Sequence, residues 1–275
     1  MAAGPRITVI GAGRLGEALI RGLLDAGAAA KGDLRATVAS SERAKLLRER
    51  YGVLVSAGAN REAVASCDIV VLGVKPGKVD SVLSELAGVL RVEQKVVSMA
   101  GAVPLSTIER STPPGTAVFR AMPNIAMTVG ESATALCEND ASTSEDRRLV
   151  GGIFGTVGSV EWVDEPAMDA VTALSGSGVA FVFHALGALT EGGKKAGLEK
   201  DAAYRLARQT LLGAARLAAE TELSPKEWID QVKTPGGTTV AGLSILERRD
   251  TREAFVEAVE SAARRAAEIQ KELAD

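Results

Sequence analysis

The sequence predicts an α/β fold in which a doubly wound parallel sheet is followed by an all-helical domain. Two observations predict the sheet: short β-branched runs alternate with amphipathic segments, and a glycine-rich turn follows the first of these runs. The third observation is a change in composition after Val163, where segments rich in Ala, Leu, Glu and Arg replace the strand-like runs. We therefore expect one domain over residues 1–164 and a helical domain over residues 165–275.

In the first half, strands and helices are expected to alternate. Runs rich in β-branched residues predict strands at 7–11, 36–40, 53–57, 68–74, 95–101, 117–122, 131–137 and 159–163. Apolar residues recur at helical spacing at 15–27, 41–52, 60–67, 78–90 and 144–158. This alternation is what a parallel sheet covered by helices on both faces requires.

The second half is expected to contain helices alone. They are predicted at 164–197, as one long or broken helix, and at 204–222, 224–232 and 252–275. Between the last two lies KTPGGTTVAG, residues 233–242, in which the adjacent glycines Gly236 and Gly237 stand among three threonines. We expect Thr238 and Thr239 to open the last long helix.

The composition excludes several classes of protein. The 275 residues carry 32 Lys and Arg against 35 Asp and Glu, so no broad basic surface for nucleic acid is expected. Cys67 and Cys137 lack the spacing of a disulfide framework or zinc site, which predicts buried, reduced thiols and no bound metal. No leader and no run of about 18 apolar residues is recognised, which predicts a cytoplasmic protein that does not bind a membrane.

The glycine-rich turn GAGRLG predicts a Rossmann-type dinucleotide site. It follows an apolar strand and opens a helix, the context in which G-x-G-x-x-G binds a pyrophosphate. Gly11 makes the tight turn, Gly13 lets the phosphates approach the backbone and Gly16 lets the helix pack on the strand. Arg14 and Leu15 complete the helix entrance, where amides and the helix dipole attract an anion.

The end of the second strand favours NADP(H), with NAD(H) possible. An acidic residue there would bind the ribose 2′-hydroxyl of NAD, but the chain has Ser40 and Ser41, with Arg43 shortly after. Glu42 remains able to serve a ribose. In the alternative interpretation one of the serines caps the next helix and Arg43 is solvated.

Further motifs make the chain resemble the Δ1-pyrroline-5-carboxylate reductase family from Ile7 to about Leu246. In order, they are GAGRLG at 11–16, VKP at 74–76, SMAG at 98–101, RAMPN at 120–124, TALSGSGVAFVF at 172–183 and TPGGTTVAGL at 234–243. The resemblance implies NAD(P)H-dependent synthesis of L-proline. It also implies a helical dimerisation and substrate domain, and an active site where domains of different subunits meet in a homodimer or a multiple of dimers.

The sequence departs from the family pattern at a few positions. Ile125 and Ala126 stand where the family usually has Thr-Pro, and Val179 and Phe181 stand where it has Pro and Tyr. The first change removes a hydroxyl and a stiff turn expected near the nicotinamide.

The resemblance implies further cofactor contacts at the carboxyl ends of the strands. They are Asn60, Val74, Lys75, Pro76, Ala100, Gly101 and Asn124. Lys75 is also a candidate proton donor, although lysines at such edges are commonly only solvated. For the two asparagines, the alternative is that their side chains form Asx turns.

The segment 233–242 is the predicted substrate site. Gly236 and Gly237 leave backbone amides unobstructed at a helix entrance, which suits the carboxylate of a small acid. Thr234 and Thr238 are candidate extra donors, and the family match implies that Thr239 hydrogen-bonds the ring nitrogen. The alternative is an ordinary Pro-Gly turn with a threonine helix cap.

Three further residues are weighed for this site. Ser175 lies in a glycine-containing stretch of a predicted helix, which indicates both a close helix crossing at a dimer interface and a kink beside the nicotinamide and substrate, with Ser175 as a candidate catalytic contact. Glu222, at a predicted helix end, is a candidate acceptor from the product amine or a solvated residue. His184 is interpreted as a core or interface residue rather than a base.

Two other functions are compatible with these motifs. One is a related two-domain reductase acting on another small imine or on a keto or hydroxy acid, for which Lys194 and Lys195 are candidate catalytic lysines. The other is a catalytically silent NADP-binding dimer.

Overall fold

The structure, a computed structural model, describes residues 4–274, which form two compact units. The first unit holds the chain up to Ser177 together with the segment from Ala262 onward, and the second holds Gly178–Ser261. The predicted domain boundary between residues 164 and 165 stays a prediction, because the units reflect contacts within a single chain.

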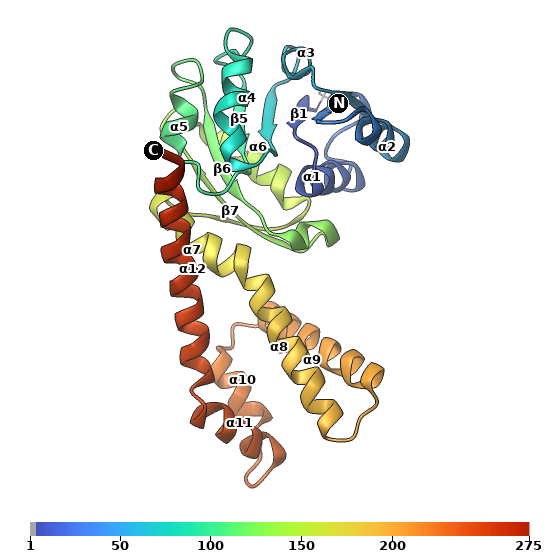
Figure 1. The fold of residues 1–275 in the computed structure, drawn as a ribbon, viewed down its shortest axis with the longest axis vertical. Helices are drawn as coiled ribbons and strands as arrows, with labels where there is room; N and C mark the ends of the chain where they lie inside the picture. Colours follow the sequence, from blue (N-terminus) through green and yellow to red (C-terminus); the bar gives the residue numbers. More distant parts are fainter. Residues whose placement is uncertain (1–3, 275) are drawn as a thin grey trace. The chain divides into compact units, whose positions relative to one another are not determined.

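The first unit contains a sheet in the order β3-β2-β1-β4-β5-β6-β7-β8, and Figure 1 labels its strands β1, β5, β6 and β7. In chain order the strands are β1 (Ile7–Ile10), β2 (Leu34–Val38), β3 (Leu54–Ala57), β4 (Ile69–Leu72), β5 (Lys95–Ser98), β6 (Val118–Met122), β7 (Ser132–Glu138) and β8 (Gly158–Trp162). The chain winds from β1 outward to β3 and then returns to β4 on the other side of β1. This order confirms the predicted doubly wound sheet.

Helices connect the strands. They are α1 (Arg14–Asp25), α2 (Ser41–Tyr51), α3 (Asn60–Val64), α4 (Val79–Leu86), α5 (Leu105–Glu109) and α6 (Ser144–Gly155), with short 3-10 helices at Lys31–Asp33, Pro76–Lys78, Ile125–Val129 and Glu165–Ala167. After β8 the chain continues through α7 (Met168–Val171) and a π-helical segment, Thr172–Ser177.

One pair of strands departs from the predicted parallel arrangement, because β7 runs antiparallel to β6. Only residues 123–131 join these strands, and they include the short 3-10 helix Ile125–Val129. A parallel connection needs a crossover of about a dozen residues or more. The short connection therefore turns the chain back on itself.

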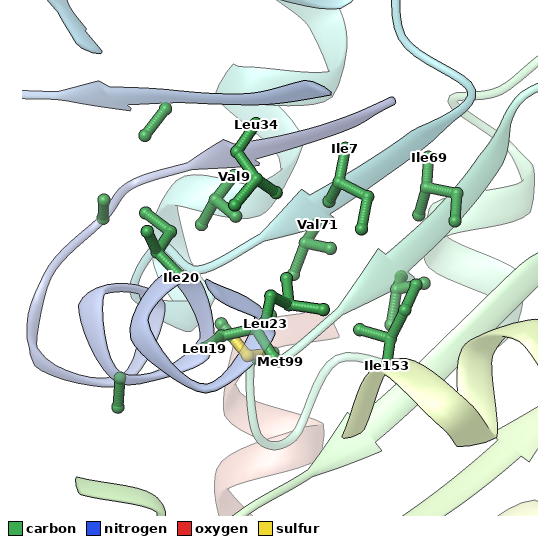
Figure 2. Close-up of a cluster of buried hydrophobic side chains, with 14 of the residues drawn as sticks. Ile7, Val9, Leu19, Ile20, Leu23, Leu34, Ile69, Val71, Met99 and Ile153 are labelled. Carbon is green, nitrogen blue, oxygen red and sulfur yellow. The ribbon is translucent and has the colours of Figure 1, made fainter. Parts of the chain in front are cut away.

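The central strands β1 and β4 are buried on both faces of the sheet, and their successive side chains point to opposite sides. In β1, Ile7 and Val9 belong to one cluster of buried side chains, whereas Ile10 belongs to a second cluster. Figure 2 shows Leu19 and Leu23 of α1 as part of the first cluster, with Ile7 and Val9. This packing holds α1 against the sheet.

The two cysteines are buried free thiols, as predicted. Burial raises the pKa of Cys67, and it raises the pKa of Cys137 to about 11. The described residues contain no cluster of His, Cys, Asp and Glu that could hold a metal ion.

The second unit is helical, as predicted. Its helices are α8 (Gly178–Lys195), α9 (Lys200–Glu220), α10 (Pro225–Val232), α11 (Thr238–Arg248) and the first part of α12 (Thr251–Ala274). α8 packs against α9, but many apolar side chains of this unit stay exposed, including Phe183, Leu206 and Val232. His184 is exposed as well, so its interpretation as a core residue is wrong, while an interface position stays a prediction.

Two predicted helix limits are wrong. α11 is not the last long helix, because it ends at Arg248 and α12 begins separately at Thr251, after Asp250 with a φ of 53°. α9 ends at Glu220, so Glu222 lies in the following loop and not at a helix end. Ser224 then caps α10 by accepting a hydrogen bond from the Glu227 amide.

Candidate active site

The predicted cofactor residues gather at one edge of the sheet. The strands β1, β2, β4, β5 and β6 run parallel there, and the register aligns Ile10 with Thr37 and Leu72, and then Leu72 with Ser98. The turns that follow these strands therefore lie side by side. Ligands of doubly wound sheets bind at this edge, where the strand order reverses between β1 and β4.

The glycine turn after β1 requires glycine on steric grounds. Gly11 has a φ of 82°, and a Cβ there would lie 2.6 Å from Cγ1 of Val74. The amides of Gly11 and Ala12 both donate to the Thr37 carbonyl, at 3.0 and 2.9 Å. The turn is thus pressed between the ends of β2 and β4.

The entrance of α1 presents backbone donors. The amide of Glu17 donates to the Gly13 carbonyl at 2.9 Å, so the amides of Arg14, Leu15 and Gly16 lie before the first bond of the helical ladder. Gly13 is exposed, and a Cβ on it would meet only the Gly11 carbonyl, at 3.9 Å. Open space beside these amides fits a pyrophosphate.

Gly11→Ala is expected to weaken NADPH binding at least about tenfold, because the new methyl must displace Val74 or reshape the turn around the phosphates. Isothermal titration calorimetry measures the dissociation constant. Gly27→Ala is a matched control, since Gly27 also has a positive φ, of 63°, but a Cβ there meets nothing within 4 Å. Equal effects of the two substitutions would contradict the steric explanation.

At the end of β2 the structure confirms the capping interpretation. Ser40 is the N-cap of α2, and its hydroxyl accepts a hydrogen bond from the Arg43 amide at 3.2 Å. Ser41 opens the helix and is exposed. The expectation of a solvated Arg43 side chain is wrong, because its guanidinium forms an ion pair with Glu17.

Glu17 is a residue of this edge that the sequence analysis missed. Besides Arg43, its carboxylate accepts hydrogen bonds from Arg50 at 2.6 Å and from the Tyr51 hydroxyl at 2.8 Å. Burial acts to raise the pKa of Glu17, but these hydrogen bonds outweigh it and lower the pKa. The only signal in the sequence is an acid directly after the third glycine, with basic residues on a neighbouring predicted helix.

The turn after β4 holds Val74 against the glycine turn, as the contact with Gly11 shows. Lys75 is exposed and extended, with φ −63° and ψ 149°, and Pro76 then opens a 3-10 helix. Beside it, after β5, the amide of Ala100 donates to the Ser98 hydroxyl at 3.2 Å. Gly101 follows, next to Met122 at the end of β6.

The two predicted asparagines have partners within the protein. Asn60 opens α3, and its side-chain amide donates to Glu85 at 2.8 Å. Asn124 follows β6, and its side-chain oxygen accepts the Ala126 amide at 3.0 Å, which confirms the Asx-turn interpretation for this residue. Its side-chain nitrogen donates to the Ser175 carbonyl at 3.2 Å.

The same contact brings the π-helical segment to the end of β6. The Ser175 hydroxyl donates to the Ala133 carbonyl at 2.8 Å, and a Cβ on Gly176 would lie 2.9 Å from the Met122 methyl. A π-helical turn inside a helix is frequent at functional sites. Ser175 thus lies next to Asn124, a predicted cofactor residue, with its oxygen lone pairs still able to accept.

The predicted substrate segment forms a helix entrance in the second unit. Gly236 has a φ of 70°, Gly237 is the N-cap of α11, and the Gly237 amide closes a turn on the Thr234 carbonyl at 2.9 Å. A Cβ on Gly237 would lie 2.2 Å from the Thr234 hydroxyl. The alternative of a threonine cap is wrong, since the cap is this glycine and no side chain caps the helix.

The threonines of α11 differ in their surroundings. Thr238 is exposed, whereas Thr239 is partly buried and lines an apolar groove with Trp228 and Leu243. The first bond of the helical ladder runs from the Ala241 amide to the Gly237 carbonyl at 3.3 Å. The amides of Thr238 and Thr239 therefore lie before the ladder, as an anion site requires.

Two family models match two different parts of this chain. The sequence model of the family described as pyrroline-5-carboxylate reductase dimerisation matches residues 165–269. A second model, described as NADP oxidoreductase coenzyme F420-dependent, matches residues 6–101. The pyrroline-5-carboxylate reductase of Methanosarcina acetivorans is 41% identical over 97% of this chain and 98% of its own.

Solved structures show the same fold. A pyrroline-5-carboxylate reductase from Coxiella burnetii superposes with a TM-score of 0.91 at 35% identity, covering 96% of this chain and 98% of that one. The pyrroline carboxylate reductase of Plasmodium falciparum, solved with NADP bound, has a TM-score of 0.84 at 27% identity, covering 95% of this chain and 97% of that one.

Proposed function

The chain belongs to the pyrroline-5-carboxylate reductase family, and we infer that it is an NAD(P)H-dependent oxidoreductase that reduces the C=N bond of Δ1-pyrroline-5-carboxylate to give L-proline. The likeness spans nearly the whole chain and both units. The other reductase and the silent dimer are not favoured, because neither explains relatives of this one name at 36–41% identity.

The carboxyl edge of the sheet binds the cofactor. Free amides at the entrance of α1 hold the pyrophosphate, and Arg43 and the α2 cap lie where the adenosine ribose and its 2′-substituent belong. The turns after β4, β5 and β6 border the nicotinamide end of the site. When bound, the reduced nicotinamide supplies the hydride.

The entrance of α11 binds the substrate carboxylate. The amides of Thr238 and Thr239 and the dipole of an 11-residue helix attract the anion, and the positive φ of Gly236 shapes the turn that exposes them. Hydroxyls of Thr234 and Thr238 add donors. Thr239 hydrogen-bonds the ring nitrogen, which fixes the orientation of the C=N bond.

Positioning carries most of the catalysis in this proposal. The iminium form of the substrate already has the proton on nitrogen that reduction requires, so a dedicated acid is not needed. Ser175 lies beside Asn124 and is a candidate contact for the reacting groups. Lys75 as a proton donor and Glu222 as an acceptor from the product amine remain secondary proposals, and both side chains are exposed.

The helical half supports self-association. The run Glu165–Lys195 is long and apolar enough to cross a membrane by composition, with mean hydropathy 1.5, yet only 11% of its apolar window is buried within one chain. Since the dimerisation model begins at residue 165, we assign this apolar surface to a second copy of the chain. The protein is therefore a homodimer or a multiple of dimers, and its active site is completed between subunits. A cytoplasmic location stays a prediction.

The test is turnover with defined substrates. Purified protein mixed with NADPH and pyrroline-5-carboxylate should oxidise NADPH, followed at its near-ultraviolet absorbance, and form proline. Tight NADPH binding without turnover would support a silent dimer. Turnover only with another imine or a keto acid would support the related reductase.

The dependence of the rate on pH tests the role of Lys75. If the iminium is the reactive form, kcat/KM should fall at alkaline pH as the substrate loses its proton, with the same midpoint in Lys75→Met as in the unchanged protein. Initial rates across the alkaline range measure this midpoint. An alkaline limb that disappears in Lys75→Met would instead make this lysine the proton donor.

A further inference from the structure

We propose that Glu17 sets the coenzyme discrimination of this protein by competing with the 2′-phosphate of NADPH for the guanidinium of Arg43. The inference rests on the proposed function, in which Arg43 serves the 2′-phosphate. It adds a positioning residue that acts on the cofactor only through Arg43.

The two residues meet at the place where the ribose substituents of a dinucleotide belong. Glu17 is in the first turn of α1, directly after the glycine turn, and Arg43 is in the first turn of α2, directly after β2. The carboxylate side chain is 15% exposed and the guanidinium side chain 33% exposed. The ion pair is therefore partly shielded from water, but Arg43 still reaches the surface from which a cofactor approaches.

The charges around Glu17 decide whether this residue raises or lowers the preference for NADPH over NADH. One carboxylate, that of Glu17, is shared by Arg43, Arg50 and the Tyr51 hydroxyl. A 2′-phosphate that approaches Arg43 therefore competes with a carboxylate that already offsets part of the charge of this guanidinium. NADH lacks a 2′-phosphate, so its binding does not compete with Glu17 for Arg43. Glu17 thereby narrows the difference in affinity between the two cofactors.

Several contacts that do not involve Glu17 also stabilise α2. Ser40 caps the helix, Gly52 ends it in the left-handed conformation, and Ala44 and Leu47 bury its inner face. Glu17→Gln keeps the shape of the side chain and one acceptor oxygen for Tyr51, while it removes the charge and the second acceptor oxygen, which faces Arg43. The substitution thus separates the electrostatic role from the structural one.

Equilibrium binding of two cofactor fragments to the full chain tests the proposal. Adenosine 2′,5′-bisphosphate and 5′-AMP differ only in the 2′-phosphate, so the ratio of their dissociation constants, from isothermal titration calorimetry, reports discrimination without turnover. In Glu17→Gln the preference for the bisphosphate should rise roughly threefold to tenfold, with 5′-AMP binding changed less than about twofold. An unchanged or reduced preference would overturn the inference.

Further variants separate failure of this inference from failure of the proposed function. Tyr51→Phe removes a neutral hydrogen bond to the same carboxylate and should leave the preference unchanged. Arg43→Gln should lower the preference, and Glu17→Gln should add nothing in the Arg43→Gln background. If Arg43→Gln has no effect, the assigned role of Arg43 is wrong and the inference falls with it. If Arg43→Gln lowers the preference but Glu17→Gln does not raise it, only the inference is wrong.

Discussion

Thr239→Val is expected to lower kcat/KM for pyrroline-5-carboxylate about a hundredfold, while the dissociation constant of NADPH changes less than about twofold. Thr239 lies in the first turn of α11, where its hydroxyl is the proposed partner of the ring nitrogen. Valine keeps the shape of the side chain that lines the apolar groove beside Trp228, so only the hydrogen bond is lost. Steady-state kinetics and calorimetric titration with NADPH measure the two quantities.

Thr238→Val is the matched comparison for this prediction. Thr238 is exposed at the same helix entrance and is assigned to the carboxylate, which is bound equally before and during hydride transfer. Loss of the Thr238 hydroxyl should therefore raise KM for the substrate and leave kcat nearly unchanged. If Thr239→Val weakened NADPH binding as much as it lowered kcat/KM, the role assigned to Thr239 would be wrong.

Glu165→Ala is expected to reduce the free energy of unfolding by about 3 kcal/mol, because it leaves the charge of Arg120 unpaired in the protein interior. The Arg120 side chain is only 4% exposed, and its Nη1 donates to Glu165 at 2.7 Å. The same carboxylate oxygen accepts the Leu105 amide at 2.7 Å, at the start of α5. Chemical denaturation followed by circular dichroism measures the loss.

Two comparisons make the stability prediction specific. Asp68→Asn removes an exposed ion pair with Arg6 and should reduce the free energy of unfolding far less, because water screens both charges. Adding Arg120→Met to Glu165→Ala should recover part of the loss, since no buried charge then remains. A loss from Glu165→Ala no larger than that from Asp68→Asn would show that the buried pair does not stabilise the fold. Within the described chain the Arg120 Nε has no partner, so the charge already depends on a single carboxylate.

Much of the fold could be predicted because its signals are local. Each strand run and most helices were recognised from β-branched content and helical periodicity, and the glycine turn was recognised from its place between a strand and a helix. The short helix Leu105–Glu109 was missed, since five residues after a proline are too few to show a period. The direction of β7 was missed because a strand pattern does not state the direction of its partner.

The candidate site was predicted unevenly for the same reason. The amides at the entrances of α1 and α11 follow from glycines at fixed spacing, which local sequence reveals. The ion pair between Glu17 and Arg43 joins residues 26 apart in the sequence, on two different helices, and the hydrogen bond from Asn124 to Ser175 joins residues 51 apart. Such contacts depend on how elements pack, and no local pattern specifies them.

The chain passes from one unit to the other at two places, both inside helical segments. The first crossing falls between Ser177 and Gly178, where the π-helical segment meets α8, and the second falls inside α12, between Ser261 and Ala262. Neither crossing is a loop, and the sheet-containing unit is assembled from two separate segments of the chain. A protease that cuts at exposed loops is therefore not expected to separate the two units at either crossing.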